Sequence, residues 1–308
     1  MKRVASLLFI LNLLPIFALA QETTTLMQIA PDAQSAGMAG VGLATTENGS
    51  TAIFHNASTI LFSQQVMGAS YSYADLNKGI NIHSGSLFYR IGRKGEQGFA
   101  LGFRHYRGAD FYLEDGPSVH SKAWNIEAAY FRNITKALSF SVTLRYLQEK
   151  ADSQAKNNKS LSLDFGTSYH KGMNILNEMA SWTVGFQVAN VGSKLDEQTL
   201  PTRVGLGGSI DLPFSVENRL QVALDVNYVL PSEYRHLQCA VGAEYNFLKY
   251  GILHAGYNFS DKNKGIGNYS TFGGGINFWP IRADFSYSLA EKSSLMHHAY
   301  QISIGIVF

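Results

Sequence analysis

The chain has 308 residues, of which 45% are hydrophobic, 12% aromatic and only 16% charged, whereas soluble domains commonly carry roughly 25% charged residues. Beyond the first twenty residues, no apolar run approaches the ~18 residues that a membrane-spanning helix needs, so a helical membrane protein is excluded. Glycine, tyrosine and phenylalanine are abundant instead, at 29, 16 and 19 residues. This composition favours one large all-β barrel over one or two soluble domains.

Residues 1–20 are typical of a secretory signal peptide. Lys2 and Arg3 form its basic start, an apolar stretch follows, and the small residues Ala18 and Ala20 precede a cleavage site before Gln21. Cleavage would leave 23 of the 25 basic residues against 23 acidic ones. We therefore expect an exported protein without the basic excess that nucleic-acid binding requires.

Residues 21–63 do not alternate between apolar and polar positions as the rest of the chain does. Small residues dominate from Ala36 to Ala44, which suits a backbone packed closely against a wall. We predict that this segment is a hatch or plug inside the barrel, with a disordered periplasmic segment as the alternative. The candidate hatch residues are Gly37, Gly40, Gly42, Phe54 and Asn56.

Residues 64–308 repeat a pattern of about ten alternating positions followed by Gly, Asn, Asp or Lys, which predicts strands joined by turns. Leu138, Phe140 and Val142 alternate with Ser139, Ser141 and Thr143, for example. An even number of strands is typical of bacterial single-chain barrels, and twelve or sixteen remain open beside fourteen. The fourteen segments are 65–75, 79–92, 97–107, 121–132, 137–150, 158–170, 180–190, 202–212, 219–229, 236–247, 251–260, 268–278, 281–290 and 299–308.

The two faces of these segments differ in chemistry. One face is apolar and aromatic and includes the single cysteine, Cys239, which we expect to act as a small hydrophobic residue. The other carries small polar residues and a balanced set of charges that can pair inside a lumen, whereas a soluble β-sandwich would expose many Lys and Glu. In lipid such strands must close on themselves, so we predict an all-β, transmembrane antiparallel barrel of about 14 strands. The predicted inward charges are Arg104, Glu127, Arg145, Asp164, Arg203, Asp225, Glu244, Arg282 and Asp284.

The connections between predicted strands alternate in length. Those at 108–120, 191–201 and 291–298 are long and those at 93–96, 133–136 and 279–280 are short, which places the long ones outside the cell. The segment 172–179 is an exception, for which we predict a small periplasmic helix. The first long connection offers Phe111, Tyr112 and Leu113 as a partner-docking patch with aromatic anchors, and Tyr106 belongs either to that patch or to an interfacial aromatic girdle.

Two short glycine clusters lie within predicted strands, at 205–208 and 273–275. They indicate either ordinary barrel curvature or places where the wall opens or the hatch comes close.

The final segment, Tyr300 to Phe308, ends an uncharged outward row on an aromatic residue, and it resembles the terminal strand signal that outer-membrane assembly machinery reads. The run from Ile29 to Ala33, followed by Ala36 to Thr45, resembles the opening of the PorV/PorQ family of Bacteroidota outer-membrane proteins, which are similar to FadL-type fourteen-stranded transporters. One departure is that the family's Asn-Pro-Ala appears here as Asn56-Ala57-Ser58.

This resemblance implies a role at the type IX secretion system, as a cargo shuttle or as a scaffold for other secretion components. The implied partners are outer-membrane lipid and secreted cargo proteins; the oligomeric state is left open. A FadL-like transporter of hydrophobic small molecules is the alternative, although the polar inward face argues against a fatty-acid channel.

An enzyme is the remaining class, and the sequence disfavours it. No Gly-x-Ser-x-Gly elbow is evident, and the nine histidines are isolated except for His297 and His298, which would point to opposite faces of a strand. We expect no catalytic residues, no metal site and no cofactor.

Overall fold

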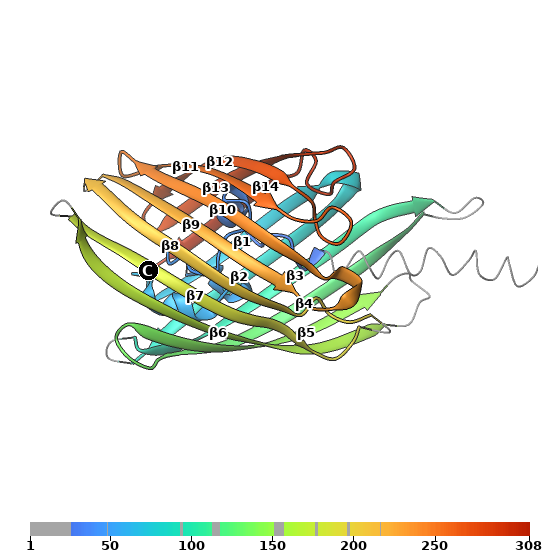
Figure 1. Cartoon of the computed structure of the whole chain (residues 1–308), viewed down its shortest axis with the longest axis horizontal. Helices are drawn as coiled ribbons and strands as arrows, with labels where there is room; N and C mark the ends of the chain where they lie inside the picture. Colours follow the sequence, from blue (N-terminus) through green and yellow to red (C-terminus); the bar gives the residue numbers. More distant parts are fainter. Residues whose placement is uncertain are drawn as a thin grey trace, which may run out of the picture.

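The computed structural model describes residues 26–47, 49–92, 95–112, 118–150, 157–175, 178–195, 198–215 and 217–308. Fourteen antiparallel strands form one closed ring in which β1 pairs with both β2 and β14 (Figure 1). The predicted fold class and strand count are confirmed. The strands are β1 Met67–Leu76, β2 Ile80–Ile91, β3 Gln97–Tyr112, β4 Ser118–Asn133, β5 Leu138–Lys150, β6 Asn158–Ile175, β7 Glu178–Gly192, β8 Arg203–Ser215, β9 Asn218–Val229, β10 His236–Phe247, β11 Gly251–Phe259, β12 Tyr269–Phe278, β13 Ile281–Ala290 and β14 Tyr300–Val307.

Alternation along each strand separates a lipid-type face from a lumenal face. On β3, Phe99, Leu101 and Phe103 are 54%, 50% and 45% exposed, whereas Ala100 and Arg104 on the opposite face are buried. Such a row of half-exposed apolar side chains on the outside is what a barrel presents to a bilayer. Within the described ranges, no helix is long and apolar enough to cross a membrane.

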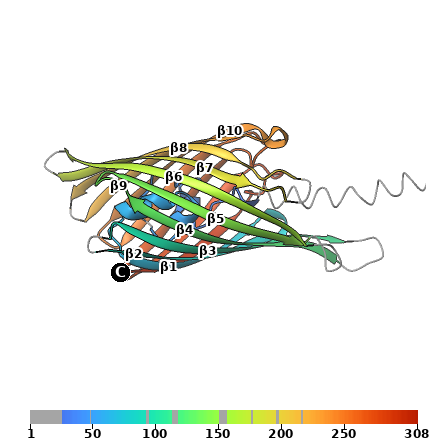
Figure 2. The ribbon, with the colours of Figure 1, turned by 90° about the horizontal axis from the view of Figure 1, so that it is seen from below.

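The segment that precedes β1 lies inside the ring and contains short helical turns (Figure 2). Because most of its side chains are buried against the wall, the barrel has a packed core rather than an empty pore. The elements outside the strands are α2 Ala33–Gly37, η1 Ala52–Phe54, η2 Ala57–Phe62, η3 Asn77–Gly79 and η4 Ser232–Tyr234.

Two predictions about the connections were wrong. The expected helix at 172–179 is a hairpin instead, in which β6 and β7 continue their ladder through Asn174 opposite Met179. The connection expected at 108–120 is shorter, because β3 and β4 still pair at Phe111 opposite Val119. In both places cross-strand hydrogen bonds extend an existing ladder, which is more favourable than nucleating an isolated helical turn or loop.

Candidate functional site: the filled lumen and its rim

Residues 26–63, here called the lumenal segment, are the part of the chain that the barrel wall encloses. Apolar residues fix both of its ends. Leu26 and Ile29 pack against Tyr106 and Tyr269 near the long connections. Ile60, with other residues of η1 and η2, packs against Phe88 and Phe131 near the short connections. The predicted signal peptide and residues 21–25 lie outside the described part of the chain.

The short helix α2 is held by a capping carboxylate. Asp32 accepts a hydrogen bond from the Ser35 backbone nitrogen at 3.0 Å, as an N-cap should, and its Oδ2 lies 3.6 Å from His55 Nε2. Burial alone would raise the pKa of Asp32, but the interaction with His55 and the hydrogen bonds from Ser35 bring that pKa below its usual value. Asp32 therefore links α2 to η1 as a buried anion.

The three candidate hatch glycines each lie where a larger residue would be strained. A Cβ at Gly37 would come within 2.8 Å of His254 Cβ on β11, and Gly40 has a φ of +89°, which favours glycine. A Cβ at Gly42 would overlap the His55 ring. The stripe of small residues therefore serves close backbone approach.

Backbone groups beside these glycines bond directly to the wall. Asp225 Oδ2, on β9, accepts hydrogen bonds from the nitrogens of Gly42 at 2.8 Å and Leu43 at 3.0 Å. Thr271 on β12 donates to the Gly37 carbonyl oxygen at 2.8 Å. Buried backbone groups need such partners, and the wall supplies them from side chains.

Asn56 is the most connected residue of the lumenal segment and is completely buried. Its amide nitrogen lies within hydrogen-bond distance of the carbonyl oxygens of Leu43 and Thr167 and of Ser168 Oγ, at 3.0, 3.3 and 3.0 Å. Its Oδ1 accepts from the backbone nitrogen and hydroxyl of Ser58, which caps η2. Asn56 thus ties two stretches of the lumenal segment to β6.

Phe54, the remaining candidate, packs against the wall rather than bordering an open path. The guanidinium of Arg104 lies 5.0 Å from the centre of its ring, which is a cation–π distance. A Cβ at Gly102 would come within 2.6 Å of Phe54 Cε1.

The wall has its own glycines opposite the lumenal segment. Cβ atoms at Gly185, Gly205 and Gly207 would overlap Leu43, and those at Gly242 and Gly256 would overlap Met38. In the first glycine cluster, close approach is therefore the explanation for Gly205 and Gly207, whereas Gly208 faces open space. In the second cluster the contacts come from neighbouring strands and His254, not from the lumenal segment.

All nine inward charges face the lumen, and most are paired there. Arg145 lies 2.9 Å from Asp164 and 3.1 Å from Glu127, which also pairs with Arg104 at 3.2 Å. Asn190, at a β-bulge with φ +59°, bonds Asp164 through its backbone nitrogen at 2.7 Å and Arg145 through its side chain.

A second network lies on the other side of the lumen. Glu244 accepts hydrogen bonds from Arg282 at 2.9 Å and from Gln34 of α2 at 2.7 Å, and His254 Nε2 lies 3.3 Å from it. Two wall carboxylates therefore hold the lumenal segment: Glu244 through Gln34, and Asp225 through the backbone of Gly42. The sequence did not predict these contacts, because the bonded residues are about 200 positions apart.

The predicted docking patch has a different setting. Phe111 and Tyr112 lie within β3 rather than in a loop, and Leu113 lies outside the described residues. Tyr106 belongs to neither patch nor girdle: it is 1% exposed and faces the lumen. His297 and His298 lie in a connection with rings 4.0 Å apart, contrary to the expected strand geometry. The described residues contain no group of three or more His, Cys, Asp or Glu side chains arranged to hold a metal ion.

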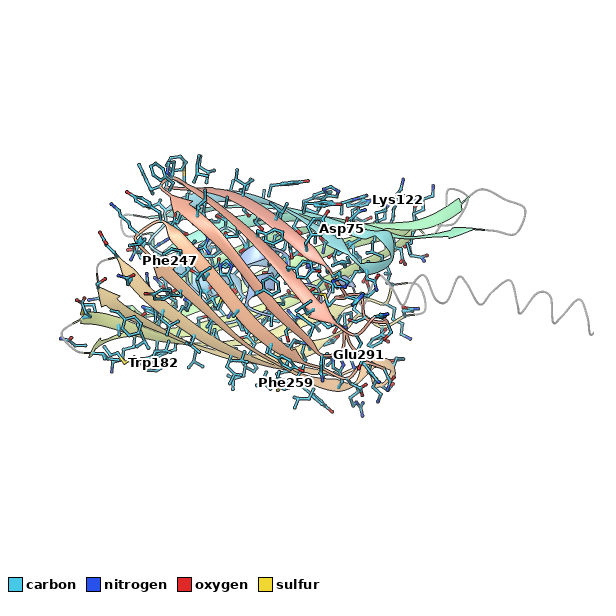
Figure 3. All side chains as sticks on the ribbon, turned by 90° about the horizontal axis from the view of Figure 1, so that it is seen from above. Asp75, Lys122, Trp182, Phe247, Phe259 and Glu291 are labelled. Carbon is cyan, nitrogen blue, oxygen red and sulfur yellow. The ribbon has the colours of Figure 1, made fainter. Side chains whose placement is uncertain are left out.

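The rim with the long connections has a cavity of its own. About 690 Å³ lies between the connections 260–268 and 291–299, where Lys262 Nζ and Glu291 Oε2 approach to 3.9 Å. Glu291 is labelled at this end of the barrel in Figure 3, with Phe247 and Trp182 at the opposite end. The residues that line this rim cavity include Tyr257, Asn263, Tyr269 and Leu289.

Comparison with known families decides the affiliation of this barrel. The model of the family described as type IX secretion system protein PorV matches residues 19–234. The chain belongs to the PorV family. No curated protein matches this PorV-family chain.

Solved structures similar to this PorV-family chain are FadL-like barrels. The CymD monoaromatic hydrocarbon channel has a TM-score of 0.59 at 14% identity, covering 91% of this chain and 98% of its own. The Pseudomonas putida toluene transporter TodX has a TM-score of 0.58 at 14% identity, with coverages of 90% and 96%. A Pseudomonas aeruginosa FadL homologue has a TM-score of 0.53 at 10% identity, with coverages of 91% and 98%. At these identities the likeness concerns the fold alone.

Proposed function

We propose that this PorV-family chain is a non-enzymatic outer-membrane component of type IX protein secretion that holds secreted cargo at its long-connection rim, as a shuttle or scaffold. The long connections are taken as extracellular, as in other bacterial barrels. The observation that carries the proposal is the filled lumen: the wall bonds the lumenal segment from strands all around the ring, including Ser86 on β2, Ser139 on β5, Asp225 on β9 and Ser303 on β14.

The cavities support binding at the rim over passage through the lumen. Beside the lumenal segment, cavities of about 30 and 60 Å³ adjoin Arg203 and Arg282, whereas small-molecule sites commonly need about 300–1,000 Å³. The rim cavity is within that range. In this proposal the lumenal segment acts as a plug that stiffens the ring and leaves binding to the connections.

Transport of a hydrophobic small molecule is the second candidate. It is favoured by the fold shared with barrels described as a hydrocarbon channel and a toluene transporter. For this chain it would require the lumenal segment to leave its bonds with Asp225 and Thr271.

The test uses the rim cavity in the native host. A strain whose only copy carries Asn263→Trp, which fills the cavity from an exposed lining position, should retain less secreted protein on tagged barrel purified in mild detergent. Ser232→Trp, at an exposed rim position outside the cavity, is the matched control. Unchanged secretion and cargo retention in the Asn263→Trp strain would reject rim docking. A stoichiometric hydrophobic molecule without protein partners would favour transport.

A further inference from the structure

Basic side chains gather on the outer wall where β4, β5 and β6 approach the long connections. Lys122 on β4 lies directly opposite Lys150 on β5 and, on its other side, opposite Arg107 on β3. Lys159 on β6 lies opposite Gln148, one diagonal step from Lys150. Figure 3 shows Lys122 at the same end of the barrel as Asp75 and Glu291.

Strand parity places the three lysines on the outward face. Lys122 and Lys159 are exposed and Lys150 is half-buried, while their neighbours Ser121, Glu149 and Ser160 are buried in the lumen. Among the described side chains of β3 to β6, the acidic residues Glu127, Glu149 and Asp164 are buried. These acidic side chains therefore face the lumen, and the charged side chains described as facing outward near the long connections of β4 to β6 are lysines.

Two features of this row call for an anionic partner. Like charges directly opposite one another on adjacent strands are destabilising, and Lys122 and Lys150 are placed in that way. Neighbouring strands are also about 4.8 Å apart, so the amines of adjacent lysines can reach oxygens of one phosphate group. Lysine binds phosphate as a point charge without demanding fork geometry.

The surface next to the row is suited to acyl chains. Trp124 lies one outward position from Lys122 along β4, and Tyr146 lies two outward positions from Lys150 along β5. Their ring centres are 5.7 Å apart. Beyond them Ile126, Leu144 and Leu161 are 48%, 45% and 51% exposed. An aromatic pair between a basic row and an apolar wall has the layering of a lipid headgroup, its interface and its chains.

We propose that Lys122, Lys150 and Lys159 form a site for the phosphate groups of an anionic lipid in the outer leaflet, whose acyl chains lie along the wall of β4 to β6. The site lies on the outside of the barrel and is separate from the lumen and the rim cavity, so it does not depend on cargo docking.

The test measures lipid binding to the purified full chain in dodecyl maltoside micelles by native mass spectrometry. The probe is diphosphoryl lipid A, with dephosphorylated lipid A and inorganic phosphate as comparison ligands. Replacing each lysine by Gln should weaken binding about fivefold, and the triple variant K122Q/K150Q/K159Q about a hundredfold, if each amine contributes as basic residues do near anionic membranes. The effect should shrink in high salt.

The matched control is K136Q/K171Q/K249Q, which removes three exposed lysines near the short connections. All variants must first show the same resistance to SDS before heating. Unchanged binding in the first triple variant, or equal loss in the control, would overturn the site. Equal binding of the dephosphorylated probe would show that phosphate is not recognised. Full competition by inorganic phosphate at equal concentration would assign the row to a free anion rather than a lipid.

Discussion

Gly207 on β8 lies against Leu43 so closely that a Cβ on the glycine would come within 2.6 Å of Leu43 Cβ. Its neighbour Gly208 points the other way and would meet nothing within 4 Å. Substitutions at these two adjacent glycines can therefore be compared. Gly207 reports on close packing against Leu43, whereas Gly208 reports only on the general effect of glycine in a strand.

We expect Gly207→Ala to destabilise the barrel by about 1–3 kcal/mol, because the added methyl group overpacks a filled interior. Gly208→Ala should instead be neutral or stabilise by about 0.5 kcal/mol, since glycine weakens a strand. The measurement is the urea concentration at which the SDS-resistant form is lost. Equal effects of the two substitutions would contradict the packing of the lumenal segment against β8.

Asn56→Ala should destabilise by about 1–3 kcal/mol, because it leaves the buried Leu43 carbonyl and Ser168 hydroxyl without this amide donor. Asn268→Ala is the control, because Asn268 accepts a hydrogen bond from Ser260 at an exposed position and such changes usually stay within about 0.5 kcal/mol. The same urea titration compares them, and similar midpoints would argue that Asn56 does not anchor the segment.

Ala57→Pro should be tolerated or stabilising by up to about 1 kcal/mol, because it reduces the freedom of the unfolded chain. Ala57 is the first residue of η2, a position whose nitrogen has no partner within a helix and which accepts proline. This would explain why a family pattern with Pro and a chain with Ala can share one conformation. A large loss of stability, measured against Ser58→Pro as the disruptive control, would show that the chain enters η2 differently.

Arg145→Gln should be the most damaging of these changes, at about 3–5 kcal/mol, because it leaves the buried carboxylates of Glu127 and Asp164 without their shared cation. Lys262→Gln, which breaks the exposed pair with Glu291, should have little effect. Thermal loss of the SDS-resistant form checks both, and a mild effect of Arg145→Gln would mean that water or other side chains compensate for the missing charge.

Deletion of residues 26–63 should raise single-channel conductance in a planar bilayer, because the polar lumen would then fill with water. Full-length protein should conduct little, and the Asn263→Trp variant should behave like it, because position 263 lies at the rim. Unchanged conductance in a deletion variant that still resists SDS would reject the plug.

Much of the fold could be predicted because strand parity is local. Alternation placed Arg145, Asp225 and Glu244 on the lumenal face from sequence alone. The same parity predicts that Tyr106 faces the lumen, because it is two residues from the inward Arg104 and therefore shares its face. The expected strand 97–107 already contained Tyr106, but the residue was assigned to the docking patch or the girdle without applying the parity of Arg104.

The partners of the lumenal segment could not be predicted in this way. The bond between Gly42 and Asp225 joins residues 183 positions apart, and it depends on the register of nine strands. Sequence indicated that the glycines need a close neighbour, but only the closed ring shows which wall residue that neighbour is.

The pairing of β1 with β14 also has a consequence for the order of assembly. The lumenal segment is synthesised before every strand, yet α2 contacts β11 to β14, which are synthesised last. Of these four strands, β14 both contacts α2 and pairs with β1, so one strand serves the plug and the closure of the ring. A chain that ends before β14 would therefore lack a closed wall and also the hydrogen bond from the Ala33 nitrogen of α2 to Ser303.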